Sequence, residues 1–103
     1  MKKYTLTRDG KRPLTFTGES IAKANNRSLQ GARQNRWDAV EVYRTESGRI
    51  VVEQVYHTCY QGESDTHTVM VFDDTSAAIT YLEQGVSSLA AEIAASLNVA
   101  EEI

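Results

Sequence analysis

The segment that decides the fold is residues 37–72, WDAVEVYRTESGRIVVEQVYHTCYQGESDTHTVMVF. Apolar and polar residues alternate along much of it, and the turn residues Ser47-Gly48 and the polar run 61–65 interrupt the alternation. Period-two alternation bounded by turn residues is typical of β-strands joined by hairpins. The segment therefore predicts three consecutive antiparallel strands, at 37–45, 49–60 and 66–72.

The preceding part of the chain adds two shorter strands to this sheet. Residues 3–8 alternate apolar and threonine side chains, and Asp9-Gly10 is a strong hairpin dipeptide. A second strand is expected from Pro13 to Gly18, since proline is tolerated at the first position of a strand. We expect one or two helical turns at 19–25 and a polar loop at 25–36.

The periodicity becomes helical after residue 72. Residues 73–76, with the sequence DDTS, supply side chains that cap a helix N-terminus, and apolar side chains then recur on one face of two segments within 75–97. The expected fold is a single α+β domain spanning 1–103, a five-stranded, mostly antiparallel β-meander with two C-terminal helices packed on one face. The opposite face must then be polar, shielded by the 25–36 loop, or buried against a partner.

Composition limits the functional classes. The 103 residues are 41% hydrophobic and 24% charged, as in ordinary globular domains. The net charge of -3 disfavours general attraction to nucleic acid, although most lysines and arginines precede Trp37. A single cysteine excludes an intramolecular disulfide. Without a signal peptide, a membrane-spanning run or a cofactor motif, we expect a cytoplasmic protein with no cofactor and no membrane partner.

One cluster of side chains suggests a metal or thiol site. If the 49–60/66–72 hairpin turns near Gly62-Glu63, opposed residue numbers sum to about 124. His57 then faces His67, and Cys59 faces Asp65, all on one side of the sheet. Two imidazoles, a thiolate and a carboxylate are possible zinc ligands, and a histidine can activate a cysteine. The alternative is ordinary cross-strand polar pairing, which we favour because no paired Cys-x-x-Cys is present.

Aromatic and basic residues form a second set of candidates. Trp37, Tyr43 and Tyr56 lie on the expected strands, and Arg33 and Arg36 lie in the loop that precedes them. Aromatic rings beside arginines are typical of platforms that bind single-stranded nucleic acid. The same residues also serve as core and interface packing in small domains, which the acidic net charge favours.

Two segments resemble a known family. Residues 43–52, YRTESGRIVV, resemble the Tyr-Arg-Thr-x-x-Gly-Arg-hydrophobic-Val signature of the EXLDI family of small prokaryotic proteins. Residues 16–22, FTGESIA, are similar to that family's Phe-x-Gly segment. The chain ends VAEEI, similar to the closing motif that gives the family its name, but without the Leu-Asp before the final Ile. The resemblance implies no particular activity.

These observations favour a non-enzymatic interaction domain. The expected docking surface is the uncovered sheet face, with either Val51, Val55, Val69 and Val71 or the strand residues of the opposite parity, or else the 25–36 loop. A second copy of the chain is a plausible partner. The first alternative is a nucleic-acid-associated or regulatory module that uses the basic N-terminal half. The second is a metal- or thiol-dependent enzyme at His57, Cys59, Asp65 and His67.

Overall fold

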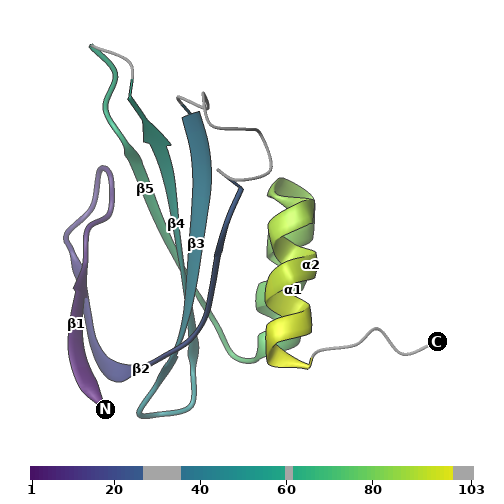
Figure 1. Cartoon of the computed structure of the whole chain (residues 1–103). Coiled ribbons are helices and arrows are strands. Elements are labelled where there is room, and N and C mark those ends of the chain that lie inside the picture. The colour runs from purple at the N-terminus through teal and green to yellow at the C-terminus, as the bar shows by residue number, and fades with distance from the viewer. Residues whose placement is uncertain (27–35, 60–61, 99–103) are drawn as a thin grey trace.

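The chain forms a five-stranded antiparallel sheet followed by two helices, as seen in the computed structural model (Figure 1). The structure describes residues 1–26, 36–59 and 62–98. The strands are β1 (Lys2–Leu6), β2 (Leu14–Asn25), β3 (Arg36–Thr45), β4 (Ile50–Thr58) and β5 (Thr66–Phe72), and the helices are α1 (Thr75–Gly85) and α2 (Ser87–Leu97). The strands lie in the sheet in chain order. The predicted α+β meander with two C-terminal helices is confirmed.

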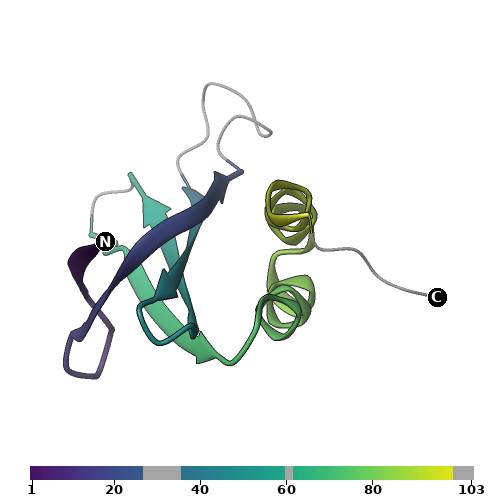
Figure 2. The ribbon, with the colours of Figure 1, turned by 90° about the horizontal axis from the view of Figure 1, so that it is seen from below.

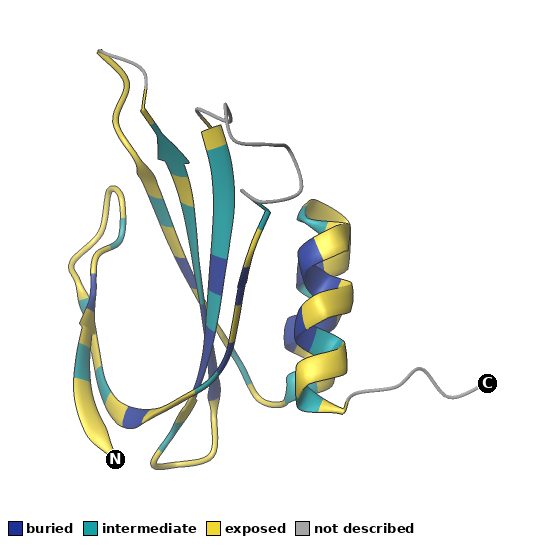
Figure 3. Cartoon of the chain, in the orientation of Figure 1, coloured by how far each residue is buried: buried dark blue, intermediate teal, exposed yellow. Residues whose placement is uncertain are grey.

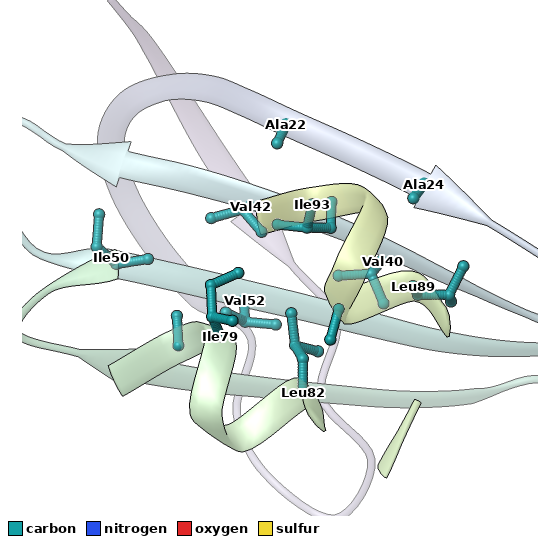
Figure 4. Close-up of a cluster of buried hydrophobic side chains, with 12 residues drawn as sticks. Ala22, Ala24, Val40, Val42, Ile50, Val52, Ile79, Leu82, Leu89 and Ile93 are labelled. Atoms are coloured by element: carbon teal, nitrogen blue, oxygen red, sulfur yellow. The ribbon is translucent and has the colours of Figure 1, made fainter. Parts of the chain in front are cut away.

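Helices α1 and α2 pack on one face of the sheet and bury the larger core (Figure 4). Leu82, Leu89 and Ile93 are completely inaccessible to solvent, and each such burial stabilises the fold by about 1.5–3 kcal/mol. Beneath them lie small and β-branched side chains of the strands: Ala22, Ala24, Val40, Val42, Ile50 and Val52. Neither helix in the described residues is long and apolar enough to span a membrane.

Strand β2 changes its partner at Gly18, and this gives the sheet its shape. Residues 14–18 pair with β1, whereas residues 18–25 pair with β3, so Gly18 alone is opposite both Lys2 and Thr45. A Cβ atom at Gly18 would lie 2.2 Å from the Arg44 carbonyl oxygen. Only glycine permits this close approach of two backbones. The sheet curls at this point, and β1 with the first part of β2 folds over the face opposite the helices.

The curled sheet buries a second, smaller core on the face that we expected to be uncovered. Figure 2 shows the β1–β2 hairpin on one side of β3–β5 and the helices on the other. Val51 and Val69, expected to be exposed, are 1% and 8% accessible, and pack with Leu6 and Tyr43. Of the four valines expected on this face, Val55 is half-buried and Val71 is exposed. Figure 3 shows that the buried residues of the helices lie on the side that faces the sheet. The expectation of a bare reverse face was wrong because β2 bends rather than ending at Gly18.

The expected helical turns at 19–25 were also wrong. This segment is the second half of β2, with a register shift between Ser20 and Ala22. Ala22 and Ala24 are buried beneath the helices, while Lys23 and Asn25 are exposed. Alanines at alternate positions give little strand propensity, but their small side chains allow α2 to approach the sheet closely. Tertiary packing therefore overrides the local preference.

Candidate functional site

A concavity on the described surface lies at the end of the curled sheet beside the β3–β4 turn. It is a groove of about 510 Å³ between β2, that turn and β5. Its apolar lining comes from Leu14, Phe16, Val51 and Val71, and its polar rim from Thr17, Thr45, Glu46, Ser47 and Arg49. An apolar floor with a few polar groups at the margin is the usual character of a binding groove.

The turn beside the groove is held in place by its own hydrogen bonds. The Thr45 amide donates to the Arg49 carbonyl at 2.8 Å, and the Arg49 amide donates to Thr45 Oγ1 at 2.9 Å. Gly48 has a φ of 88°, which favours glycine at this position. The Glu46 amide donates to the Thr17 carbonyl at 2.8 Å and ties the turn to β2. The rim of the groove is therefore preorganised.

Strand β5 borders this groove and is the last strand of the sheet. The His67 amide and carbonyl point away from β4, since both bond to Asp9, at 2.9 and 3.1 Å. Backbone groups alternate in direction along a strand, so Val69 and Val71 also direct their N–H and C=O groups outward. No neighbouring strand is present on that side in the described part of the chain. Residues 66–72 contain no Asp, Glu, Lys, Arg or Pro, the residues that usually protect an edge.

A polar cluster lies deeper on the same face of the sheet. Glu41 and Glu53 are directly opposed on β3 and β4, and the Tyr43 hydroxyl donates to Glu53 Oε1 at 3.1 Å. Ser20 donates to Glu41 Oε2 at 2.6 Å. Burial, and then the charges of Glu53 and Glu41, raise the pKa of Tyr43. The tyrosine therefore stays neutral and acts as a donor that separates two like charges. Tyr43 is only 3% exposed and belongs to the smaller core, so of the two roles considered for it, packing in the core is the one that the structure shows.

The histidines do not meet as we expected. Opposed residues in the β4–β5 pair sum to 122, so His67 faces Val55 rather than His57. His57 instead has its Nδ1 3.0 Å from Asp65 Oδ2. Cys59 is exposed and free. Among residues 1–26, 36–59 and 62–98, no three His, Cys, Asp or Glu side chains form a group that could hold a metal ion. The assumed register was wrong by two residues, so the four side chains do not converge, and His57 with Asp65 form a polar pair of the kind favoured from the sequence.

The polar side chains near this hairpin form hydrogen bonds with its backbone and with one another. Asp65 Oδ1 accepts the Thr58 amide at 3.0 Å, and this bond, followed by that of His57, lowers the pKa of Asp65. Arg36 makes two hydrogen bonds with Glu63, at 2.6 and 3.2 Å. Those bonds, and then one from Thr58, lower the pKa of Glu63. These contacts join Arg36 of β3 and Thr58 of β4 to residues 63–65 of the hairpin.

The remaining candidates lie apart from one another. Trp37 stacks on His57, with ring centroids 5.0 Å apart, on the curled face. Tyr56 is on the opposite face and is 37% exposed. Arg33 and most of the 25–36 loop lie outside the described residues. At the margins of that loop, the Asp38 amide donates to Asn26 Oδ1 at 2.8 Å. The described aromatic candidates therefore do not form one continuous stacking platform.

Basic residues gather on the β1–β2 hairpin, within the basic N-terminal half that the sequence indicated. Five of the eleven lysines and arginines occur within residues 2–12: Lys2, Lys3, Arg8, Lys11 and Arg12. All but Arg8, which is half-buried, are exposed. The only acid in that stretch is Asp9, whose carboxylate accepts the His67 amide. The sequence showed this charge asymmetry, but the two arginines named as interaction candidates, Arg33 and Arg36, lie outside the hairpin.

In comparisons with known proteins, no family model, no curated protein and no solved structure matches this chain. The site is therefore interpreted from its own chemistry.

Proposed function

We propose that this protein is a non-enzymatic interaction module that binds an extended protein segment along β5 and in the adjoining groove. The observation that carries the proposal is the part of the β5 edge beyond His67, where the β1–β2 hairpin makes no backbone bond in the described residues. Outward backbone groups at Val69 and Val71 lie beside an apolar groove of about 510 Å³. An edge strand that lacks charges and proline accepts an additional strand readily.

The mode of binding follows from the arrangement of these groups. The backbone of the bound segment pairs with β5, and every second side chain then points toward the groove. Leu14, Phe16 and Val51 provide apolar contact for such a side chain, and the polar rim contacts the flanking residues. Backbone pairing supplies affinity, and the groove supplies the preference for apolar side chains.

A displayed library of random twelve-residue peptides tests this function. We expect the immobilised protein to enrich peptides with apolar residues at alternate positions. Val71→Lys places a charge in the groove and should abolish the enrichment. Ser88→Lys adds the same charge on the exposed surface of α2 and should preserve it. Absence of any enriched pattern with the unmodified protein, or an equal pattern with Val71→Lys, would contradict the proposal.

The basic hairpin favours a second candidate, binding of an anionic partner such as nucleic acid. Five basic side chains within residues 2–12 would neutralise several phosphates despite the net charge of -3. Fluorescence anisotropy with labelled single-stranded and duplex oligonucleotides tests this at low and high salt. A steep loss of binding with salt, removed by Lys2→Ala with Lys11→Ala, supports it. Flat isotherms at low salt exclude it.

A further inference from the structure

We propose that the segment bound at the β5 edge is β5 of a second copy of the chain, so that two sheets join into one continuous antiparallel sheet. This inference rests on the proposed function, because it names the partner for the same edge. Three features of the molecule support it: the charges of the two sheet edges, the outward backbone groups of β5, and the exposure of Met70.

The charges of the edges select self-pairing of β5. Strand β5 carries no Asp, Glu, Lys or Arg. Two β5 strands can therefore pair in any register without placing like charges opposite each other. The other sheet edge, β1, begins with the exposed Lys2 and Lys3. Pairing β1 with itself would bring these lysines near one another, and lysines on an edge oppose strand addition in general. Pairing of β5 with β5 of a second copy is symmetric, so the assembly is complete as a dimer. Pairing of β1 with β5 of another copy would leave one edge free on each subunit and would extend without limit.

The outward backbone groups determine the register. His67 is already bonded to Asp9 at both its amide and its carbonyl, so the pairing can use only Val69 and Val71. Both are used when Val69 is opposite Val71 of the second copy, and Val71 opposite its Val69. This register forms four backbone hydrogen bonds, because each hydrogen-bonded pair of residues exchanges two. The two-fold axis then passes beside Met70.

The exposure of Met70 suits a position beside this two-fold axis. Its side chain is 40% exposed, one of the largest exposed apolar surfaces in the described residues. Next to the axis, Met70 of each copy would face its counterpart as a non-hydrogen-bonded pair, with Cα atoms about 4.5 Å apart. Two flexible thioether side chains can then cover each other. On the other face, Val71 (37% exposed) would lie beside Val69 of the second copy, at the margin of the groove.

Disulfide trapping tests both the dimer and its register. In a Cys59→Ser background, Met70→Cys should form a disulfide-linked dimer under mild oxidation, because a Cα separation of about 4.5 Å permits a disulfide. Thr68→Cys is the matched control, on the same strand and the same face. Its counterpart in the second copy would be about 14 Å away, which is too far for a disulfide. We expect the Met70→Cys variant to cross-link at least about tenfold faster than Thr68→Cys.

Sedimentation equilibrium of the unmodified protein provides the second measurement, so the test does not depend on folding of the cysteine variants. We expect reversible dimerisation that Val71→Lys abolishes. A monomer at every concentration, or equal cross-linking of the two cysteine variants, would overturn the inference. If the peptide library still yields groove-dependent peptides in that case, the interaction function stands with another partner. If it yields none, both proposals fail.

Discussion

Gly18 shows how one residue sets the shape of the whole sheet. Because the Arg44 carbonyl oxygen lies 2.2 Å from the position of an added Cβ, Gly18→Ala must push β2 away from β3. We expect this substitution to lower the free energy of unfolding by about 2–4 kcal/mol, as overpacking against backbone does. Urea unfolding followed by circular dichroism measures the loss.

The matched control for Gly18 is Gly85→Ala. Gly85 ends α1, and no heavy atom beyond its immediate neighbours lies within 4 Å of an added Cβ. This substitution should leave stability unchanged or raise it by about 0.5 kcal/mol, because alanine restricts the unfolded chain. Equal losses for the two variants would contradict the close-approach argument.

Tyr43 makes stability depend on alkaline pH. Its folded-state pKa is raised above the ordinary value of 10.0, chiefly by burial. The neutral tyrosine is therefore the form that the fold accepts. Its contribution to stability is complete below pH 10 and is lost as the pH rises further. Tyr43→Phe should cost about 1–2 kcal/mol near neutral pH, through the lost hydrogen bond to Glu53, and should flatten the decline above pH 10.

The measurement for Tyr43 is urea unfolding at pH values from neutral to strongly alkaline. Tyr56→Phe serves as the control, because Tyr56 is 37% exposed on the other face. The difference between the two variants removes contributions from the remaining lysines and tyrosines. If Tyr43→Phe and the unmodified protein lose stability in parallel above pH 10, the hydroxyl is not protected by the fold.

At the scale of the elements, helix α1 begins with a pair of acids that differ in role. Asp74 is the N-cap, and its Oδ1 accepts the Ala77 amide at 2.8 Å. The Asp73 side chain is 92% exposed, with only a 3.7 Å ion pair to Arg49. Asp74→Ala should lower stability by about 1 kcal/mol, and Asp73→Ala by less than about 0.5 kcal/mol. Thermal unfolding of both variants measures this, and a larger loss for Asp73→Ala would refute the assignment.

The elements also show what could be predicted from the sequence. The alternation in 66–72 gave the bounds of β5 correctly, and the acids 73–74 gave the start of α1. Such signals are local, since a strand's alternation and a helix cap act within a few residues. The register of β4 against β5 was wrong by two residues because turn geometry, rather than side-chain pattern, determines it. A shift of two keeps each side chain on its face, so the pattern cannot detect it.

The groove was harder to predict than the strands and helices, because its residues are far apart in the sequence. Groove residues come from β2, the β3–β4 turn and β5. They meet only because β2 bends at Gly18, and a single glycine in the sequence equally predicts the end of a strand. Val51 and Val69 were therefore assigned to an open face, although they are buried. Of the four valines assigned to that face, Val71 is exposed and Val55 is half-buried.

At the scale of the whole molecule, two bonds close the curled sheet. The Asp9 carboxylate accepts the His67 amide at 2.9 Å, and the Asp9 amide donates to the His67 carbonyl at 3.1 Å. These bonds join the β1–β2 hairpin to β5 across 58 residues of sequence. They hold Leu6 over Tyr43 and Val69, so the smaller core depends on them.

Asp9→Ala removes the side-chain acceptor and should loosen the hairpin while the helix-covered core persists. We expect the amides of β1 to exchange with solvent about fivefold faster, the effect of losing a hydrogen bond worth roughly 1 kcal/mol. Amides of β3 and β4 should be unaffected, because they pair within the sheet. Asp9→Asn keeps an acceptor oxygen and should restore most of the protection. Native-state hydrogen exchange of the three proteins measures these differences. Equal acceleration of exchange in every strand would show that the hairpin and the rest of the sheet open together, and would contradict a local role for Asp9.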